Sequence, residues 1–576
     1  MPGAVRANES VAALLTEYAE LLALTGGDPF RARVYEKAAR SVAGHATDVT
    51  RLSSAELRKI PGVGASIAEK IEEFVHTGAI RAVDELRAKV PAGVLAMTAI
   101  PGLGPKTAML LYEKLGIDSV DALESALDAG ALAGMKGIGP KTAANLRHGI
   151  ALSRAQTGRF TVDVATRTAL DIVEALRALP ECERCTYAGS LRRKRDSIGD
   201  IDILAAAQDP RPLMRRLVEL PIVTEVIVAG DKKTSVRTVS GLQVDLRVVP
   251  LASWGAALIY FTGSKEHNVR LREMAVRRGL KLSEYGLFTV DTDELIVSET
   301  EEAVYERLGL AWIPPTLRED RGEIEAAAQG TLPILLTEQD IQGDLHTHTN
   351  LTDGVSTLDE MVAAARARGL AYLAITDHAK NLPMQRMTDA KMLRQREQIR
   401  SMDAGDMVLL HGTELNIDPE GDVDWDAEFL AGFDVCVASV HSHFTQSSDD
   451  MTRRFIRACE NPYVHIIGHP TTRQIGRRPA VEADWDAVFE AAGRTGTAME
   501  INAYPDRLDL PDELILRAKR HGVKFALDTD SHSTVHFGHL PFGVGQAQRA
   551  WLTADDVITA WPLPRLREFL QAKANR

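Results

Sequence analysis

The 576-residue sequence contains only four cysteines and no uninterrupted apolar run approaching ~18 residues. Four cysteines cannot form a disulfide framework in a chain of this length, and the missing apolar run excludes a membrane span. The first ten residues, MPGAVRANES, have no basic segment followed by an apolar core, so we expect a cytoplasmic protein without a secretory signal. Bulk disorder is excluded because 45% of the residues are hydrophobic and 26% are charged.

Charge and histidine are distributed unevenly along the chain. The net charge is −13, yet residues 1–330 are nearly neutral and almost the whole acidic excess follows them. Twelve of the 16 histidines lie after residue 341. The length predicts about three to five domains, and the uneven distribution divides them into two chemically different parts. The acidic sum therefore does not exclude a nucleic-acid partner for the N-terminal part.

Three glycine turns punctuate the helical pattern of residues 1–150. They read IPGVGA from Ile60, IPGLGP from Ile100 and MKGIGP from Met135, and a helical stretch follows each turn. Glycine tolerates positive φ and leaves backbone N–H groups bare at a helix N-terminus, where they bind phosphate without reading a base. The repeat resembles the helix-hairpin-helix motif and predicts a clamp on the DNA backbone, although a helix C-cap without a ligand uses similar residues. The predicted DNA-binding residues are Gly62, Gly64, Gly102, Gly104, Lys106, Gly137, Gly139 and Lys141.

In residues 158–250 the helical pattern gives way to apolar and polar residues that alternate as in β-strands. This region contains three aspartates that could bind metal. Asp200 and Asp202 lie two residues apart on one predicted strand, so their carboxylates face the same side. Asp245, in the predicted strand VDLRVV, supplies a third carboxylate. Three such ligands suit two Mg²⁺ ions that activate a sugar hydroxyl and stabilise a pyrophosphate leaving group. A lone Asp-x-Asp is more often a solvated strand end, but Gly189 and Ser190 upstream are suitable donors to a triphosphate and favour catalysis.

From residue 341 onward, strand and helix signals alternate, which predicts parallel strands with right-handed crossovers in a barrel or an open sheet. Histidine and carboxylate residues stand at the ends of nearly all these strands, a position where barrel enzymes place their chemistry. Mixed imidazole and carboxylate ligands favour Zn²⁺, Mn²⁺ or Fe²⁺ over Mg²⁺ alone. Because the ligands are too many for one ion, we expect two or three ions and phosphoester hydrolysis by metal-activated water. The seven predicted strands are 344–349, 373–378, 408–417, 435–442, 464–470, 498–503 and 524–532.

The first part of the chain resembles the family X DNA polymerases from about residue 5 to about residue 315. The resemblance rests on Gly189-Ser190 followed by GDID from Gly199, on VDLR, on YFTGSKEHN from Tyr260, and on the stretch PGVG with IAEKI. It implies that Asp200, Asp202 and Asp245 bind two Mg²⁺, with Asp245 helping to activate the primer 3′-hydroxyl. It also implies that Lys70 occupies the position of a lyase lysine, for which we expect weak or no activity. The implied nucleotide-binding residues are Arg159, Gly189, Ser190, Arg193 and Gly199 for the triphosphate, and Tyr260, Phe261, Gly263 and Asn268 for the sugar and base.

The second part, residues 341–576, resembles the polymerase and histidinol phosphatase (PHP) domain. The motifs that carry this resemblance include His346-Thr-His348, Thr376-Asp377-His378, Gly468-His469-Pro470 and Asp528-Thr-Asp530-Ser-His532. The resemblance implies a metal-dependent 3′-5′ exonuclease. The implied metal ligands are His346, His348, Asp353, His378, Glu414, His441, His469, Asp530 and His532.

Together these patterns predict a multidomain repair enzyme: an all-α helix-hairpin-helix region, an α+β nucleotidyltransferase palm with a small thumb, and a distorted seven-stranded (β/α) PHP barrel. The expected function is short-gap filling by a DNA polymerase with 3′-end processing, and the expected partners are gapped or primer-template DNA and dNTPs. We expect a monomer with no membrane contact. One alternative is a DNA-binding repair nuclease whose polymerase site is idle. Another is a nucleotidyltransferase acting on RNA or a small molecule, against which the three glycine turns and the YFTGS stretch argue. The expected domains are residues 1–90, 91–155, 156–250 and 251–315, a linker at 316–340, and the PHP domain at 341–576.

Overall fold

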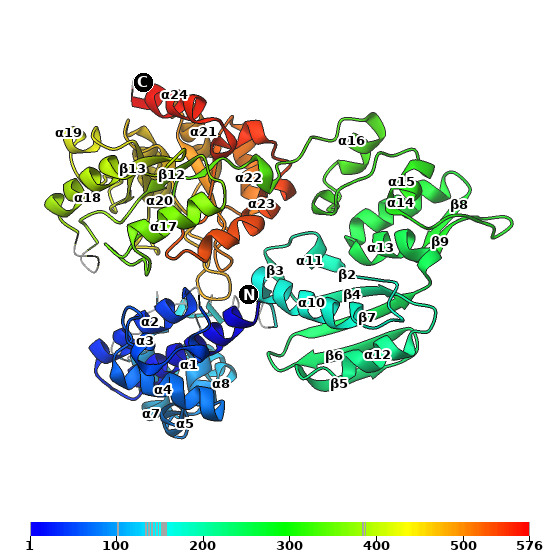
Figure 1. Cartoon of the computed structure of the whole chain (residues 1–576), viewed down its shortest axis with the longest axis horizontal. Coiled ribbons are helices and arrows are strands. Elements are labelled where there is room, and N and C mark those ends of the chain that lie inside the picture. The colour runs from blue at the N-terminus through cyan, green and yellow to red at the C-terminus, as the bar shows by residue number, and fades with distance from the viewer. Residues whose placement is uncertain are drawn as a thin grey trace.

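The computed structural model describes residues 2–574 apart from residues 46, 99, 101–102, 133–134, 136–138, 140–141, 145, 148, 151–157, 383–384 and 386. Figure 1 shows a helical N-terminal unit, a mixed α/β middle and a C-terminal barrel that lies against both. None of the helices in these described ranges has the length and apolar character needed to cross a membrane. The predicted fold class is confirmed.

The N-terminal unit is a stack of short helices around one apolar core. Helix α1 contributes Leu15 and Leu21 to that core, and the helix after the first glycine turn contributes Ile71. Gly64 and Gly104 directly precede α4 and α7, as the glycine turns predict. The helices are α1 (Pro2–Leu24), α2 (Pro29–Ala43), α3 (Ser54–Leu57), α4 (Ala65–Thr77), α5 (Arg81–Arg87), α6 (Ala92–Met97), α7 (Pro105–Leu115) and α8 (Val120–Asp128).

The palm unit is built on a five-stranded sheet in the order β2-β4-β7-β6-β5. Strands β4 and β7 pair in parallel, whereas the other neighbouring pairs are antiparallel. Helix α10 packs on the sheet through an apolar face that includes Ala169 and Ile172. The elements are β1 (Phe160–Thr161), α10 (Val162–Arg177), β2 (Arg184–Tyr187), α11 (Gly189–Arg192), β3 (Ser197–Ile198), β4 (Asp200–Ala206), α12 (Arg211–Val218), β5 (Val223–Ala229), β6 (Lys233–Thr238) and β7 (Gln243–Val249).

The thumb unit follows directly and includes part of the segment 316–340 that the charged, proline-bounded sequence predicts as a linker. Ile324 and Ala327 of α16 are buried in the same cluster as Ile259 and Leu271, and Arg318 is fully buried. The first part of this segment is therefore a packed element, because two apolar residues three positions apart put one helix face into the core. The elements are α13 (Trp254–Thr262), α14 (Lys265–Val276), β8 (Leu280–Ser283), β9 (Gly286–Thr289), β10 (Leu295–Val297), α15 (Glu301–Arg307) and α16 (Glu323–Gln329).

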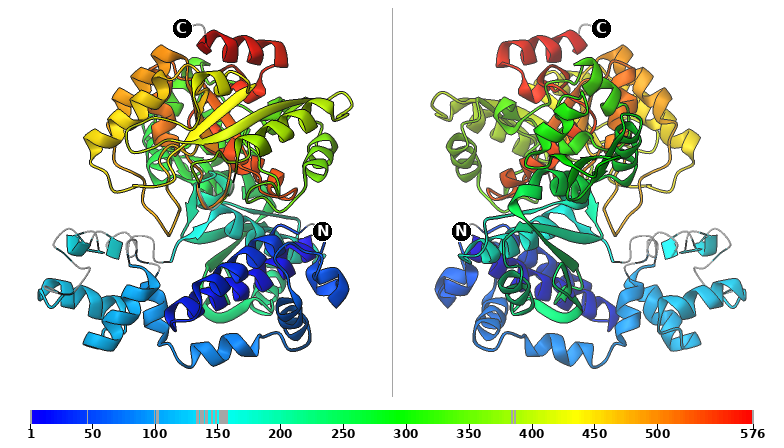
Figure 2. Two further views of the ribbon diagram at one scale, coloured as in Figure 1. Left: turned by 90° about the vertical axis from the view of Figure 1, so that its left-hand side faces the viewer. Right: turned by 90° about the vertical axis from the view of Figure 1, so that its right-hand side faces the viewer.

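The C-terminal unit is a parallel sheet whose strands follow the chain order from β11 to β17. An additional bridge between Thr347 and Ser531 connects the two edges, so the sheet is nearly closed into a barrel. Helices surround the strands, as Figure 2 shows from two sides. All seven predicted strands are confirmed, each with one to several residues trimmed from its polar end. The strands are β11 (Gly343–Asp344), β12 (Tyr372–Ile375), β13 (Val408–Asn416), β14 (Val435–Ser439), β15 (Ile466–Ile467), β16 (Ala498–Asn502) and β17 (Phe525–Asp528).

The helices of the barrel alternate with these strands and bury one apolar face each. Phe455 of α20 and Phe489 of α21, for example, are fully buried in the largest core cluster. The helices are α17 (Leu358–Ala367), α18 (Asp389–Ser401), α19 (Ala427–Leu430), α20 (Ser448–Glu460), α21 (Trp485–Thr495), α22 (Asp512–Arg520), α23 (Leu540–Arg549) and α24 (Leu563–Ala574).

Candidate active sites

The three aspartates predicted as a metal site converge at one edge of the palm sheet. Asp202 of β4 lies directly opposite Asp245 of the parallel strand β7, and Asp200 lies two residues before Asp202 on the same face. One carboxylate oxygen from each residue lies within 4.8 Å of the others. Burial, and then repulsion from Asp200 and Asp245, raises the pKa of Asp202 to about 7. A cation near the three carboxylates would offset this repulsion and favour their ionised forms.

Gly189 is the first residue of α11, and the carboxylate of Asp202 leaves no room for a side chain at this position. A Cβ added there would lie 2.1 Å from Asp202 Oδ2, and Gly189 also has a φ of +60°. The Gly189-Ser190 turn is thus placed against the aspartate cluster, where the start of a helix presents backbone N–H groups. This contact explains in steric terms why the motif needs glycine at this position.

Neighbouring polar groups hold Asp245 ready as a ligand. Lys233 Nζ lies 2.5 Å from Asp245 Oδ2, and Gln243 Nε2 donates a hydrogen bond of 3.1 Å to Oδ1. Burial opposes ionisation, but hydrogen bonds from Lys233, Ser235 and Gln243 keep the pKa of Asp245 below its usual value. Asp202 and Asp245 therefore have pKa values shifted in opposite directions within one cluster.

The residues predicted to bind the nucleotide lie around Arg193, at the junction of palm and thumb. Arg193 Nη1 donates to the carbonyl of Thr262 at 2.5 Å, and a Cβ on Gly263 would lie 3.1 Å from the same nitrogen. Asn268 Nδ2 donates to the carbonyl of Tyr260 at 2.7 Å. The rings of Tyr260 and Phe261 are in edge contact with centroids 5.1 Å apart, and Tyr260 is 39% exposed.

Arg159 and Gly199, also predicted to contact the triphosphate, lie next to each other. A Cβ on Gly199 would lie 3.6 Å from Arg159 Nη1, and Arg159 Nε donates a hydrogen bond of 3.0 Å to Ser197 Oγ. The guanidinium is therefore held beside the loop that leads into β4. Ser190 lies on α11, one residue after Gly189.

The helix-hairpin-helix residues do not join either carboxylate cluster. Gly62 has a φ of +83°, and space is open above Gly64, Gly104 and Gly139. Lys106 is exposed at the start of α7. The predicted residues Gly102, Gly137 and Lys141 lie outside the described residues.

Lys70 of α4 lies between two tyrosine rings on the helical unit. Its Nζ is 5.5 Å from the ring centroid of Tyr18 and 5.7 Å from that of Tyr35, and it donates a hydrogen bond of 3.2 Å to Ser66 Oγ. These contacts hold an ammonium ion well, since aromatic faces attract a cation.

The nine residues predicted as PHP ligands meet at the carboxyl ends of the barrel strands. Glu414 is the centre: its carboxylate lies 2.8 Å from His378 Nδ1, 3.0 Å from His441 Nε2 and 3.0 Å from His469 Nε2. Burial opposes ionisation, yet His378, His441 and His346 hold the pKa of Glu414 well below its usual value.

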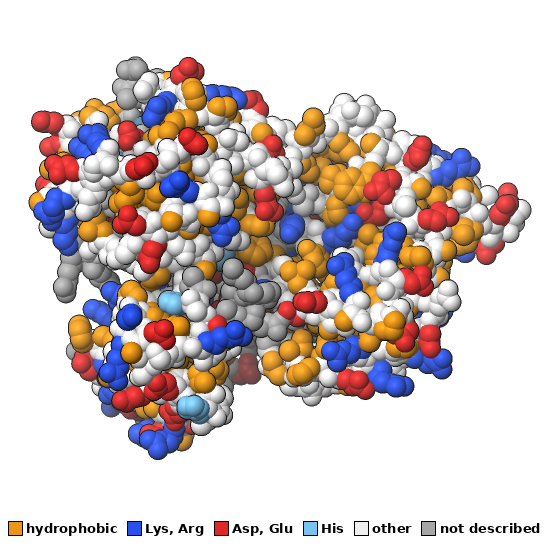
Figure 3. Space-filling view, viewed as in Figure 1, with side chains coloured by type: hydrophobic (Ala, Val, Ile, Leu, Met, Phe, Trp, Pro, Cys, Tyr) orange, Lys and Arg blue, Asp and Glu red, His pale blue; other side chains and the backbone are white. Residues whose placement is uncertain are grey.

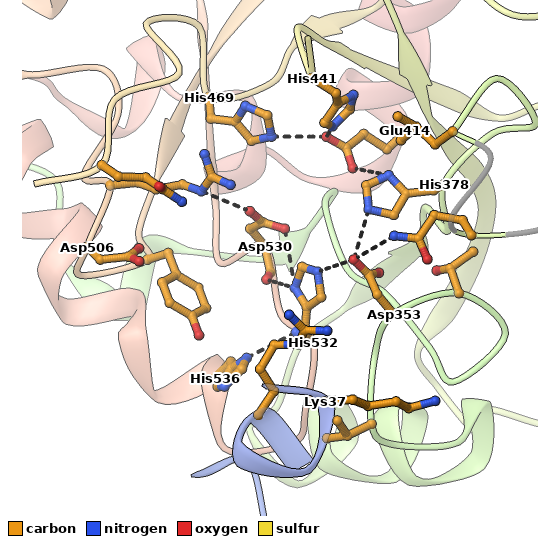
Figure 4. A pocket seen from close by; sticks show the side chains of 18 of the residues that line it. Lys37, Asp353, His378, Glu414, His441, His469, Asp506, Asp530, His532 and His536 are labelled. Atoms are coloured by element: carbon orange, nitrogen blue, oxygen red, sulfur yellow. Dashed lines mark hydrogen bonds and ion pairs between the residues drawn. The ribbon is translucent and has the colours of Figure 1, made fainter. Parts of the chain in front are cut away.

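Asp353 and Asp530 connect the rest of the set, and Figure 4 shows Asp353 between His378 and His532, with Asp530 beside His532. Asp353 lies 3.2 Å from His378 and 3.4 Å from His532, and Asp530 lies 3.3 Å from His348 and 3.7 Å from His346. The ligand atoms fall into three overlapping groups: His348, Asp353, His378 and His532; His346, His348 and Asp530; and His378, Glu414 and His441.

The donor set fits bound metal ions. His346 Nε2, His348 Nε2 and Asp353 Oδ1 are buried polar atoms without a hydrogen-bond partner. Native interiors leave few such atoms unpaired, and these three point into one cluster of mixed imidazole and carboxylate ligands. The three overlapping groups match the two or three ions expected from the number of ligands.

Three further residues of this site escaped the sequence analysis. The carboxylate of Glu500, on β16, forms a hydrogen bond of 2.6 Å with His346 Nδ1. This bond favours the tautomer of His346 in which Nε2 is left for a metal. Arg507 lies 3.9 Å from Asp530, and the ring of His536 accepts a hydrogen bond of 3.1 Å from the backbone N–H of His532. Only Glu500 carries a usable signal, because it is the one charged residue in the apolar strand AMEIN.

A chain of ion pairs joins the predicted nucleotide site to the barrel. Glu319 lies 3.0 Å from Arg193 and 2.7 Å from Arg549 of α23, and Arg549 also lies 2.8 Å from Asp512. Nearby, Arg473 of the barrel lies 2.9 Å from Asp196. The arginine-rich loop after α11 is therefore attached to both the thumb and the barrel.

Comparisons with known proteins match four parts of the chain. Family models match at residues 6–80 (helix-hairpin-helix domain), 94–150 (SAM-like helix-hairpin-helix tandem), 257–319 (DNA polymerase beta thumb) and 344–504 (PHP domain). The chain is 34% identical to "DNA polymerase/3'-5' exonuclease PolX" of Bacillus subtilis, covering 97% of this chain and 98% of that protein.

Two other proteins match only part of this chain, and they have different named functions. DNA polymerase lambda of Rattus norvegicus is 27% identical over 53% of this chain and 56% of its own length. A protein named as a probable phosphatase, from Thermoanaerobacter sp., is 30% identical over 40% of this chain and 96% of its own length.

The raised pKa of Asp202 predicts a pH-dependent cost to stability. The folded protein binds this proton more tightly than the unfolded chain, so ionisation destabilises the fold increasingly as the pH rises from about 4 to about 7, and fully above that. In EDTA, Asp202→Asn should raise the melting temperature of the palm more at pH 8 than at pH 5, measured by calorimetry. The exposed Asp231→Asn serves as control, and an equal effect of Asp202→Asn at both pH values would contradict the assignment.

The contact between Glu500 and His346 predicts a role in metal retention. Removal of a hydrogen-bond partner from a metal-ligating histidine lowers metal affinity by about 10–100-fold. Glu500→Gln should therefore weaken Mn²⁺ binding to the barrel by that factor in isothermal titration. The exposed Glu490→Gln on α21 should leave the affinity unchanged, and equal Mn²⁺ affinity in both variants would exclude this role for Glu500.

Proposed function

We infer that this chain extends DNA at the palm and degrades it with the 3′-5′ exonuclease of the barrel. It belongs to the bacterial PolX-type family X DNA polymerases. The observation that carries this conclusion is the presence of two separate ligand clusters, the aspartate triad and the nine PHP residues, in one chain. We propose short-gap filling in DNA repair as the cellular task. The substrates are then gapped or primer-template DNA and dNTPs, in the cytoplasm of the cell.

The palm site supports nucleotidyl transfer with two Mg²⁺ ions held by Asp200, Asp202 and Asp245. The bound ions would neutralise the triphosphate and lower the pKa of the primer hydroxyl. The chain's own residues position the reactants. Asp245 is paired with Lys233 and helps to activate the primer 3′-hydroxyl, while the N–H groups at Gly189 and Ser190 donate to phosphate oxygens.

Arg193, Arg159 and Gly199 contact the triphosphate in this proposal, and Tyr260, Phe261, Gly263 and Asn268 line the sugar and base pocket. The aromatic pair Tyr260 and Phe261 senses the 2′ position of the sugar. Because Arg193 is paired with Glu319 at 3.0 Å, the triphosphate takes the place of that carboxylate when it binds.

The barrel site supports phosphodiester hydrolysis with two or three Mn²⁺ or Zn²⁺ ions held by His346, His348, Asp353, His378, Glu414, His441, His469, Asp530 and His532. The bound ions would supply a hydroxide nucleophile near neutral pH. Glu500 orients His346, and Arg507 stands beside Asp530 where a phosphate oxygen carries negative charge. Water and the strand enter through the open cavity above the cluster.

The helical unit holds the DNA backbone through its glycine turns and Lys106. We propose that residues 1–90, 91–155 and 156–250 act as the lyase-like, fingers-type and palm domains, and that the thumb extends from 251 to about 330 to include α16. The remaining residues up to 340 connect it to the PHP domain at 341–576. The chain acts as a monomer, because both clusters are complete within it.

Separate sites predict separable activities on one substrate. With a labelled primer opposite a one-nucleotide gap and Mg²⁺ or Mn²⁺, Asp200→Ala should abolish extension by at least about 1000-fold and spare degradation. His346→Ala should have the reverse effect, because it removes a ligand of the other cluster.

Matched controls are Asp231→Ala in the palm and His521→Ala on the barrel surface, which should retain both activities. If each active-site variant lost both activities, independent sites would be wrong. If the wild-type chain never extended the primer, the molecule would be a DNA-binding nuclease with an idle polymerase site.

The contacts of Lys70 predict weak or no lyase activity. A Schiff-base lysine must be free to reach and attack an aldehyde, whereas Lys70 Nζ lies over the rings of Tyr18 and Tyr35 and donates a hydrogen bond to Ser66 Oγ. Borohydride trapping on an abasic substrate should give little adduct with the wild-type chain. An abundant adduct that disappears in Lys70→Ala and persists in Lys89→Ala would overturn this prediction.

A further inference from the structure

Helix α2 of the N-terminal unit carries a cationic stripe. Arg33, Lys37 and Arg40 are four and three positions apart, so their side chains lie on one face of the helix. None of the ion pairs within the described ranges of the chain involves any of the three. Three unpaired cations on one face are available to an anion.

The other face of α2 fixes the direction in which this stripe points. Tyr35, Ala38, Ala39 and Val42 are buried in the core of the helical unit. The helix therefore cannot turn about its axis without exposing its apolar face, which would lose ~25 cal/mol for each Å² of apolar surface brought back to water. The stripe is held outward from its own domain.

The cationic stripe faces the PHP cluster across a cavity. A cavity of about 790 Å³ is lined on one side by Arg33, Lys37 and Arg40 and on the other by metal-ligand candidates such as Asp353 and His532. Figure 4 shows Lys37 on the α2 segment, across from Asp353 and His532. Residues separated by more than 300 positions in the chain thus form one site.

The two units touch at the edge of this cavity. A Cβ added to Gly44, just after α2, would lie 2.9 Å from Ser533 Cβ and 3.2 Å from a methyl group of Val355. Gly44 thus permits close approach of α2 to the loop that follows His532. On the face of the molecule seen in Figure 3, basic and acidic side chains are mixed, so a local cluster rather than a general surface charge marks the entry.

We propose that Arg33, Lys37 and Arg40 bind backbone phosphates of the DNA strand whose 3′ end enters the PHP cluster. This proposal rests on the exonuclease function inferred above and extends it: the N-terminal unit completes the nuclease site. A strand fits better than a small phosphate ester, because the barrel alone holds the scissile phosphate while the stripe lies at the outer wall.

The length of the stripe agrees with a strand. The seven helical steps from Arg33 to Arg40 span about 10 Å. The stripe is therefore long enough to meet more than one phosphate of a strand. Contacts to phosphates carry no base information, so the exonuclease should show no sequence preference that depends on these residues.

The test compares a long and a short substrate on the full-length protein. The variant Arg33→Gln/Lys37→Gln/Arg40→Gln should raise KM for a single-stranded 20-mer by about 10–100-fold at 0.1 M salt. The slope of log(1/KM) against log[salt] should become shallower by about 2, since each lost contact on a single strand contributes about 0.7. Hydrolysis of bis(p-nitrophenyl) phosphate with Mn²⁺ should change by less than about twofold.

Two further variants serve as controls. The first tests whether charge or side-chain packing matters, and the second tests whether cations elsewhere on the surface have the same effect. Arg33→Lys/Lys37→Arg/Arg40→Lys keeps all three charges and should retain the wild-type KM and salt slope. Arg394→Gln/Arg400→Gln/Arg520→Gln removes three exposed cations from the outer helices α18 and α22 and should also leave both unchanged. Thermal unfolding of each variant checks that the fold is intact.

The outcomes distinguish this proposal from the function on which it rests. An unchanged KM and salt slope in the glutamine variant would overturn the proposal, and so would an equal loss on the small diester, since that would place the cations at the metal cluster itself. If the wild-type chain hydrolysed neither substrate with Mn²⁺, the exonuclease assignment would fail first.

Discussion

Parallel pairing of strands brings side chains from distant segments to one sheet edge, and both active sites depend on it. In the palm, the register of β4 and β7 sets Asp202 opposite Asp245. In the barrel, seven parallel strands end on one rim, so ligands from residues 346 to 532 form one cluster. Each arrangement concentrates groups that repel one another or remain unpaired without a cation. Metal binding is the physical reason that such arrangements persist in a folded chain.

The sequence was sufficient to predict which acidic and histidine side chains converge, but not the residues that contact them. Strand ends with His-x-His, Asp-x-Asp or Asp-x-His are visible as local patterns, and the aspartate triad and eight of the nine PHP residues lie in such close groups, while His469 contacts Glu414. Glu500 stands alone in a strand, and its contact with His346 joins residues 154 positions apart. Long-range pairing of this kind depends on the packed fold and leaves no spacing to recognise.

The same limit explains the two largest differences in domain organisation. The charge and proline content of residues 316–340 suggested a linker, but Ile324 and Ala327 pack into the thumb core. Helix α2 shows a basic stripe in its sequence that is typical of any solvated helix face. Only the approach of Gly44 to Ser533 reveals that this stripe faces the barrel. Ion pairs from Arg193 through Glu319 to Arg549 further connect the two catalytic units.

The central claim is that one chain holds two separate groups of metal ions. Crystals grown with Mn²⁺ and measured for anomalous scattering test it directly. The account predicts one group of peaks within coordination distance of Asp200, Asp202 and Asp245, and a second group of two or three peaks between Glu414, Asp353 and Asp530. Peaks at the barrel alone, or peaks away from both sets of side chains, would contradict it.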